Sequence, residues 1–309
     1  MNSSPQIIIN ADDLGFSPQV NAAILRCAEW GTITAASAMV NMPFAEDAVQ
    51  QVGQRVPHLS LALHFTLTSG TPVSPPQEIP LLVDPNGFFR LGFLGLWRTL
   101  ASKQRTALLA QIQTELSAQL GLMDQLAEKY HVRFDHLDSH QHVHALPGIW
   151  ELLQQEATQR CLPIRVPRER WGNFKRWAHR CPSWLPTGVL KQTILNWCLR
   201  NMSQEIGYFG ILETGRMDQS AFLAIFQSIR RYPFFTTYEI NTHPSTQEEV
   251  NGVAVCCSEA DKQFHASPWR EKEWQALNRE DILHRAQQYG MTLTGFAETQ
   301  HKKRFIQKT

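Results

Sequence analysis

The segment 134–144, FDHLDSHQHVH, gathers the side chains best suited to binding a metal ion. It holds four of the chain's twelve histidines within nine residues, with Asp138 among them. Neutral imidazole and carboxylate are common ligands of zinc and other divalent cations. We therefore expect this segment to supply part of a divalent-metal site. Its candidate groups are His136, Asp138, His140, His142 and His144.

Other polar side chains stand where predicted strands end. An apolar, β-branched run at 6–10 precedes Asp12 and Asp13, and the run LSLALH at 59–64 ends in His64. In a parallel barrel the chemistry lies at the carboxyl ends of the strands, so these residues are expected to meet there. Later strands add further candidates by the same reasoning, namely Arg165, Arg168, Glu239 and His243.

Predicted strands and helices alternate along most of the chain. Ser17 and Pro18 mark a helix start, and apolar residues at helical spacing predict a long amphipathic helix at 103–129. This alternation is typical of right-handed βαβ units and a parallel sheet, and at this length a (β/α) barrel with seven or eight parallel strands is expected. The expected strands lie at 6–10, 34–40, 59–64, 133–137, 162–166, 208–212, 235–242 and 291–295.

We see no linker that would divide the chain, so we expect one domain over residues 1–309. A stretch rich in proline, glycine and threonine begins at residue 66, and a tryptophan-rich segment follows the fifth strand. We interpret 66–102 and 167–207 as insertions on the active-site face. Loops as long as the first one often serve as lids or binding loops.

Composition and charge exclude several classes of protein. Lys and Arg total 29 against 28 Asp and Glu, so no basic field favours nucleic acid as a partner. No apolar run approaches the ~18 residues that span a membrane, and the N-terminus lacks a signal-peptide pattern. We therefore expect a soluble, cytoplasmic protein. Six scattered cysteines without CxxC spacing are expected to be free thiols rather than a zinc ribbon.

The adjacent aspartates admit more than one interpretation. On an extended chain Asp12 and Asp13 point to opposite sides, so one can bind a metal while the other acts separately. This geometry disfavours a glycosidase, whose two carboxylates face each other across the sugar bond. The pair could instead cap the following turn, and His64 taken alone could be a core histidine. One carboxylate with two imidazoles also suits a 2-His-1-carboxylate iron oxygenase.

Five motifs give the chain a family resemblance over residues 6–245. It resembles the YdjC/ChbG/HpnK family of carbohydrate deacetylases, with the motifs in the same order. The Ala-Asp-Asp block and His-Leu-Asp-Ser-His are the most specific. The resemblance implies a distorted, TIM-like (β/α) barrel with a metal held by one aspartate and two histidines. The motifs are NADDLG, LALHFTLTSG, HLDSHQHVH, IRVPRE and NTHPS.

Position by position, the resemblance also implies roles for individual residues. Asp13, His64 and His140 would hold the metal. Asp12 would be the catalytic base, His243 the general acid, and Arg165 would orient the base. The remaining candidates would support the ligands or line the substrate cleft, and they are Asp138, His136, His142, His144, Arg168 and Glu239.

The implied reaction removes the N-acetyl group from an N-acetylglucosamine-containing sugar, such as a chitooligosaccharide or a related glycoconjugate. Water activated by the metal would attack the acetamide. The expected cofactor is one divalent ion, magnesium or zinc, with manganese and cobalt also compatible. A homodimer is the expected assembly. The alternatives are a catalytically weak sugar-binding or regulatory protein and the iron oxygenase.

Overall fold

Strand β1 (Gln6–Leu14) lies in the middle of the sheet, and its sequence explains why. It starts with three isoleucines that are fully buried, and β-branched residues favour strands. One edge of β1 pairs with β6 (Thr237–Thr242). The other edge pairs first with β7 (Thr292–Leu293) and then with β2 (Ala35–Ala38). The computed structural model describes residues 4–169, 185–246, 263–264, 266–277 and 279–299.

Every pairing between the named strands is parallel, as predicted. The strand order is β4-β3-β2-β1-β6-β5, where β3 is Ser60–Phe65, β4 is Phe134–Ser139 and β5 is Gly207–Phe209. The sheet curls into a half-barrel. It is not closed, because among the described residues no ladder joins its two end strands, β4 and β5. The prediction of a distorted α/β barrel is confirmed.

The strand predicted at 162–166 is wrong in extent. Only Ile164 forms a bridge, with Leu137 of β4. Leu137 N donates to Pro163 O, and Arg165 N donates to Leu137 O, both at 2.9 Å. Pro163 and the proline at 167 have no N–H to donate, which limits the ladder. The short extended piece still fixes the backbone of Arg165 beside β4.

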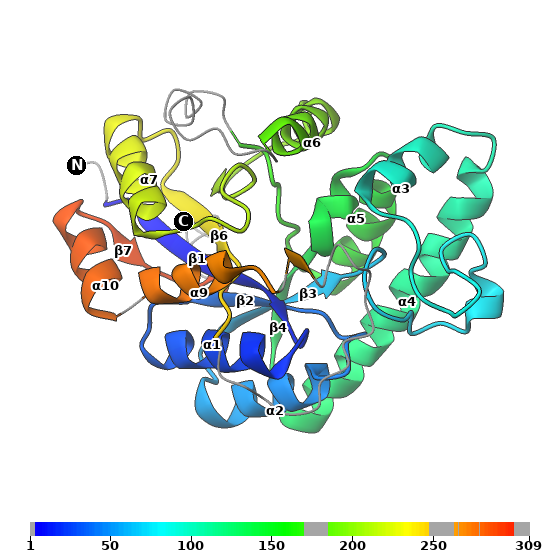
Figure 1. Ribbon diagram of the computed structural model, residues 1–309, viewed down its shortest axis with the longest axis horizontal. Helices are drawn as coiled ribbons and strands as arrows, with labels where there is room; N and C mark the ends of the chain where they lie inside the picture. The colour runs from blue at the N-terminus through cyan, green and yellow to red at the C-terminus, as the bar shows by residue number, and fades with distance from the viewer. Residues whose placement is uncertain (1–3, 170–184, 247–262, 265, 278, 300–309) are drawn as a thin grey trace, which may run out of the picture.

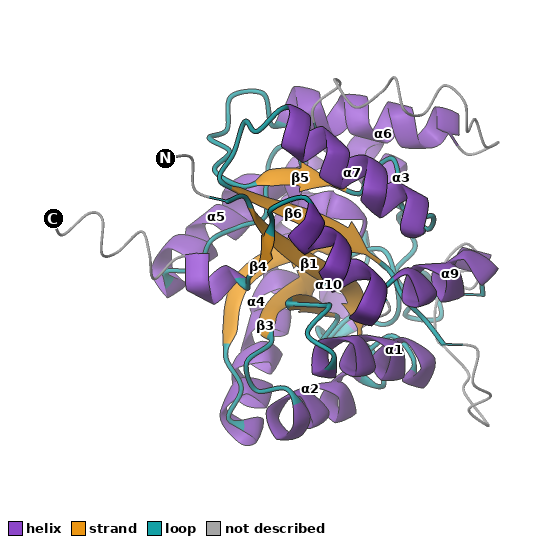
Figure 2. Ribbon diagram, turned by 90° about the vertical axis from the view of Figure 1, so that its left-hand side faces the viewer, coloured by secondary structure: helices purple, strands orange, loops and turns teal. Residues whose placement is uncertain are grey.

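Helices cover the outer side of the strands (Figures 1 and 2). Helix α1 (Pro18–Glu29) begins as predicted, because Ser17 Oγ accepts a hydrogen bond from Val20 N and Pro18 follows as the first helical residue. Helix α4 (Arg105–Tyr130) is the predicted long helix. No helix in the described part of the chain is long and apolar enough to cross a membrane. The remaining helices are α2 (Ala45–Arg55), α3 (Phe93–Leu100), α5 (Ile149–Arg160), α6 (Leu185–Cys198), α7 (Gln219–Arg231), α9 (Pro268–Ala276) and α10 (Arg279–Gln288), with short 3-10 turns η1 (Pro76–Glu78) and η2 (His140–Ala145).

The segment predicted as a first insertion, 66–102, contains η1 and α3 and is held by two buried side chains of α4. Gln119 bonds both backbone groups of Thr66, accepting from its N–H at 3.0 Å and donating to its carbonyl at 2.7 Å. The Glu115 carboxylate accepts from the backbone N–H groups of Val73 and Ser74, each at 2.9 Å. Because Thr66 comes directly after β3, these bonds also fix the end of that strand.

The second predicted insertion, 167–207, lies partly outside the described residues, which omit 170–184. Its described part contains α6. Three of the six cysteines are free thiols, as expected, namely Cys27, Cys161 and Cys198. The other three lie in stretches that the structure does not describe.

Inward-facing side chains change from apolar to polar along the strands. Side chains alternate along a strand, so Ile8, Asn10 and Asp12 of β1 share one face. Ile8 packs in a small apolar cluster, whereas the Asn10 amide donates to Asp12 at 2.9 Å. The polar ends of the strands therefore meet on one face of the half-barrel, as expected for a parallel barrel. The same spacing on β6 and just beyond it gives Glu239, Asn241 and His243.

Candidate metal centre and active site

The end of β1 aims two consecutive carboxylates at one imidazole. The pairing of β1 with β2 shifts register between Ala11 and Leu14, and Asp13 has a φ of +72°. This left-handed backbone is uncommon outside glycine, although aspartate adopts it more readily than most residues. The expectation that Asp12 and Asp13 point to opposite sides is wrong, because it assumes a regular strand. Asp12 Oδ2 lies 3.9 Å from His64 Nε2, and Asp13 Oδ1 lies 3.6 Å from the same atom.

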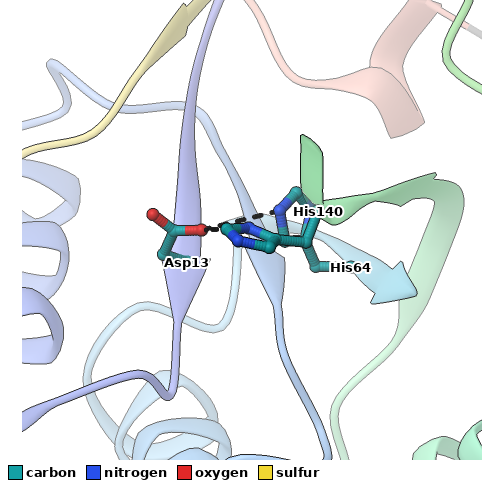
Figure 3. Close-up of side chains that lie close together, drawn as sticks. All are labelled: Asp13, His64 and His140. Atoms are coloured by element: carbon teal, nitrogen blue, oxygen red, sulfur yellow. Dashed lines mark hydrogen bonds and ion pairs between the residues drawn. The ribbon is translucent and has the colours of Figure 1, made fainter. Parts of the chain in front are cut away.

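Asp13, His64 and His140 meet at a point where a cation could bind. They come from β1, from β3 and from the residue that follows β4. Asp13 Oδ1 is 3.1 Å from His140 Nδ1 and 3.6 Å from His64 Nε2, and Figure 3 shows this oxygen turned toward both rings. One ligand atom from each residue lies within 4.8 Å of the others, and all three residues are buried. These are the three residues predicted as metal ligands.

The buried nitrogen of His64 shows that the group suits a metal ion. His64 Nδ1 lies 2.7 Å from Asp138 Oδ1, so the ring donates its Nδ1 proton to Asp138 and keeps a lone pair on Nε2. Nε2 is buried and has no hydrogen bond within the described residues. Burial alone would raise the pKa of Asp138, but Arg165 and His64 outweigh it and hold that pKa well below its usual range. A carboxylate-supported imidazole facing another carboxylate is a donor set for a divalent ion.

Three donors fix the carboxylate of Asp12. Asn10 Nδ2 donates to Oδ1 at 2.9 Å, and Asn241 Nδ2 donates to Oδ2 at 2.8 Å. Arg165 Nη1 donates to Oδ1 at 3.0 Å. The orientation they impose leaves Oδ2 3.8 Å from His243 Nε2. Asp12 thus faces both a predicted metal ligand, His64, and the predicted general acid, His243.

Arg165 connects Asp12 to two other buried carboxylates. Its Nη1 lies 2.7 Å from Asp138 Oδ2, and its Nη2 lies 2.6 Å from Glu239 Oε1. Desolvation raises the pKa of Glu239 to about 7, with Arg165 acting in the opposite direction. One fully buried guanidinium therefore links the predicted base, the partner of His64 and a carboxyl group deeper in the half-barrel.

His243 follows β6 and packs beside Asp12. Its ring meets Phe264 edge-on, with the centroids 5.4 Å apart. Its backbone N–H donates to Glu273 Oε2 at 2.6 Å. Burial lowers the pKa of His243 to about 4, with Asp13 and Asp12 acting in the opposite direction.

Comparison with known proteins identifies the family of the chain. The model of the YdjC-like protein family matches residues 6–288. The chain belongs to the YdjC-like family. This YdjC-like chain is 40% identical over 162 residues to a chitooligosaccharide deacetylase of Proteus mirabilis (strain HI4320), covering 52% of this chain and 59% of that protein. It is 36% identical over 162 residues to a carbohydrate deacetylase of Brevibacillus brevis, with the same coverage.

These two matches span about 59% of the length of each relative. A longer match, 26% identical over 297 residues, joins the chain to a carbohydrate deacetylase of Thermoanaerobacter pseudethanolicus and covers 94% of this chain and 98% of that protein. The fold is similar to the crystal structure of a protein of Enterococcus faecalis V583 described as a cellobiose-phosphate cleavage protein. The TM-score is 0.66 at 20% identity, over 96% of this chain and 99% of that one. This likeness supports a shared fold.

Two further histidines of the 134–144 cluster have structural contacts. His136 Nδ1 lies 2.6 Å from Asp135 Oδ1, and its ring stacks on Phe296 at a centroid distance of 3.8 Å. His144 lies between Ser139 Oγ at 2.6 Å and the Arg165 backbone carbonyl at 2.9 Å, and burial lowers its pKa to about 4. His144 therefore connects the end of β4 to the backbone that carries Arg165.

His142 and Arg168 also lie outside the candidate metal site formed by Asp13, His64 and His140. His142 Nε2 is 3.3 Å from Tyr208 Oη, and burial holds the pKa of His142 well below its usual range. Arg168 Nη1 donates to the carbonyl of Leu199 at 2.8 Å, and its Nε donates to Gln204 Oε1 at 3.1 Å. Cationic side chains favour the carbonyl end of a helix. We assign Arg168 to anchoring the end of α6.

Two basic residues reach the site without having been predicted. Arg270 of α9 is fully buried, and its Nη1 lies 3.0 Å from Asp13 Oδ2. Lys191 of α6 lines a cleft of about 630 Å³ together with Gln141 and Phe264, which neighbour the metal group and His243. Burial lowers the pKa of Lys191 to about 8, with Asp12 acting in the opposite direction. No sequence signal singles out either residue, since basic side chains in such helices are usually solvated.

Asn10 and Asn241 were also missed, although a signal for them exists. Each is the first residue of a motif, NADDLG or NTHPS, and each stands two positions before a predicted catalytic residue. The two-residue period of a strand places such residues on the same face. That rule would have brought both amides next to Asp12 and His243.

Proposed function

We propose that this chain is a metal-dependent carbohydrate N-deacetylase that hydrolyses the acetamide of an N-acetylglucosamine-containing sugar. One observation carries the proposal: Asp13, His64 and His140, which could together hold a metal ion, lie beside a separate, firmly oriented carboxylate, Asp12. A metal that activates an amide and a base beside it are the two parts that amide hydrolysis needs. The relatives named chitooligosaccharide and carbohydrate deacetylases support the same reaction class.

The residues of the chain divide the work of the hydrolysis. A divalent ion held by Asp13, His64 and His140 would supply Lewis-acid activation of the amide and of water. Asp12 accepts the proton of the attacking water as the new carbon–oxygen bond forms. The imidazolium form of His243 donates a proton to the nitrogen as the carbon–nitrogen bond breaks. The products are acetate and a free amino sugar, and Arg165 keeps Asp12 in the orientation for proton transfer.

The same proposal includes the kind of metal, the cleft that would bind the sugar and the class of substrate. The mixed oxygen and nitrogen donors suit zinc or magnesium, and manganese and cobalt remain compatible. The cleft of about 630 Å³ beside the metal group is the proposed place for the sugar. Its wall combines the aromatic ring of Phe264 with the cation of Lys191, and both side-chain types are suited to a polar ring with apolar faces. We propose a chitooligosaccharide or a related acetylated glycoconjugate as the substrate.

The test is acetate release after metal removal and reconstitution. N-acetylglucosamine and its oligomers of rising length would be offered to the apo protein and to protein loaded with each metal in turn. Asp13→Ala and His140→Ala should lose metal-dependent release, while His58→Ala, a change at an exposed histidine, should not. Release at the unaltered rate by the folded Asp13→Ala and His140→Ala proteins would refute the proposal. Metal-dependent sugar binding without release would favour a binding protein, and aerobic turnover of an oxoacid with iron would favour an oxygenase.

A further inference from the structure

Helix α9, whose sequence is PWREKEWQA, carries two ionisable side chains into the interior. Arg270 and Glu273 are three residues apart, so they lie on one face of the helix, and both are fully buried. A charge is costly to bury unless it is paired or hydrogen-bonded. The contacts of these two side chains therefore indicate what the helix is placed to do.

Glu273 fixes the helix to the protein beside the site. Its Oε2 accepts from the backbone N–H of His243 at 2.6 Å, and its Oε1 accepts from that of Met217 at 3.1 Å. The backbone carbonyl of Arg270 accepts from Ser245 N at 3.2 Å. The position of α9 relative to the end of β6 is thus set by bonds that do not involve the Arg270 side chain.

The guanidinium of Arg270 is directed at Asp13. Its Nη1 lies 3.0 Å from Asp13 Oδ2, while Nε and Nη2 have no hydrogen bond within the described residues. The ring of Phe264 packs over the guanidinium at 5.0 Å, which limits its other orientations. Asp13 Oδ2 is accordingly the one side-chain acceptor that Arg270 contacts in the described part of the chain.

The two oxygens of Asp13 then have separate partners. Oδ2 is bonded to Arg270, whereas Oδ1 lies 3.1 Å from His140 Nδ1 and 3.6 Å from His64 Nε2. Figure 3 shows one oxygen facing the imidazoles and the other turned away from them. We propose that Arg270 is a positioning residue that holds Asp13 as a one-oxygen metal ligand, with Oδ1 offered to the ion. This inference rests on the proposed metal site and adds to it a residue from the far end of the chain.

Removing Arg270 should change metal affinity in opposite directions, depending on whether Arg270 positions Asp13 or only repels the ion. If Arg270 acted on the ion only as a neighbouring positive charge, its removal would tighten binding. If it fixes the ligand, its removal weakens binding, because hydrogen-bonded partners of metal ligands typically contribute 10- to 100-fold in affinity. The direction of the change therefore separates the two effects.

Binding of Co²⁺ provides the test. The dissociation constant of Co²⁺ and the visible spectrum of the bound ion both report on the ligands, and neither measurement needs a substrate. We expect Arg270→Met to weaken Co²⁺ binding about 10- to 100-fold and to alter the spectrum. Arg270→Lys keeps the charge but lacks the planar fork, so we expect a smaller loss and also an altered spectrum. Lys272→Met, an exposed change on the same helix, should match the unaltered protein in both readouts.

The outcomes that overturn the proposal are distinct. Unaltered or tighter Co²⁺ binding by Arg270→Met, with an unaltered spectrum, would overturn it. If circular dichroism shows that Arg270→Met does not fold, Arg270→Lys decides, and an unchanged affinity and spectrum would then overturn the positioning role. Failure of the unaltered protein to bind Co²⁺ or any other divalent ion would instead count against the proposed metal-dependent function.

Discussion

Asp12 and Asp13 are consecutive, yet both face the Nε2 atom of His64, at 3.9 and 3.6 Å. The register shift in β1 and the left-handed backbone at Asp13 make this possible. Residues held in such a conformation persist because the surrounding structure fixes them, and they often occur at functional sites. Here Arg165 and two asparagine amides hold Asp12, and Arg270 holds Asp13.

The different partners of the two aspartates predict different effects of neutralising them. We expect Asp13→Asn to abolish tight binding of a divalent ion, because it weakens the one carboxylate of the proposed ligand set. Asp12→Asn should leave metal affinity within a few fold and lower kcat by about 10²- to 10⁴-fold, the range for loss of a general base. Calorimetric metal titration and acetate release measure the two effects. Equal losses of metal affinity in both variants would contradict the separate roles.

A third carboxylate, that of Asp138, should affect metal binding although it is not one of the proposed ligands. Asp138 accepts the Nδ1 proton of His64 at 2.7 Å and thereby fixes the lone pair on Nε2. Asp138→Asn can present an N–H to the ring and favour the wrong tautomer. We expect the dissociation constant for the metal to rise 10- to 100-fold, which is the usual effect of losing a hydrogen-bonded partner of a metal ligand. Asp124→Asn, at an exposed aspartate of α4, is the matched control and should have no effect on metal binding.

Local sequence signals predicted much of the fold. The Ser17-Pro18 start of α1, the single stripe of α4 and the parallel sheet all follow from residues close together in the sequence. The predicted ligands Asp13, His64 and His140 do come together. Each of them follows an apolar run that could be recognised as a strand, and the carboxyl ends of parallel strands converge.

The parts that could not be predicted depend on contacts between distant segments. The left-handed backbone at Asp13 is set by its surroundings, and an Asp-Asp pair is equally compatible with a regular strand. Arg270 lies 257 residues from Asp13 in a helix whose composition is that of a solvated surface helix. Only the packing of α9 against the end of β6 shows that this arginine is buried. The bridge at Ile164 also depends on tertiary packing, because the nearby prolines disfavour a longer strand.

The end of β3 should be sensitive to a side chain of α4. Gln119→Leu keeps the approximate size but leaves the buried N–H and carbonyl of Thr66 without their side-chain partners. Each lost partner costs about 1–3 kcal/mol, so we expect a loss of roughly 3 kcal/mol in the free energy of unfolding. Urea denaturation measures it. Gln125→Leu, at an exposed position of the same helix, should change stability by less than about 0.5 kcal/mol.

The proposed role of His243 as general acid predicts that the effect of replacing it depends on the leaving group of the substrate. If it protonates the departing nitrogen, His243→Gln should lower kcat on the acetamide by about 10²- to 10⁴-fold. An activated acetate ester has a leaving group that needs no proton, so its hydrolysis should fall far less. The ratio of the two rates is the measurement. An equal loss on both substrates would indicate that His243 affects the site in another way.

The buried carboxyl of Glu273 predicts a specific pH dependence of stability. Desolvation raises the pKa of Glu273 from 4.5 to about 7 in the folded protein, partly opposed by the backbone N–H groups that it accepts from. The folded state therefore binds this proton more tightly than the unfolded state does. The contribution of Glu273 to the free energy of unfolding is therefore complete below about pH 4.5 and is lost as the pH rises through about 7.

Glu273→Gln isolates this contribution, because glutamine is neutral at every pH and resembles the protonated side chain. We expect the free energy of unfolding of the unaltered protein, relative to Glu273→Gln, to fall by roughly 2–3 kcal/mol between pH 5 and pH 8. Taking the difference is necessary, because His144 and His243, whose pKa values are lowered to about 4, change stability in the opposite direction as the pH falls through about 6.5 to 4. Urea denaturation of both proteins at each pH gives the difference. A constant difference across this interval would show that Glu273 does not titrate with a raised pKa in the folded protein.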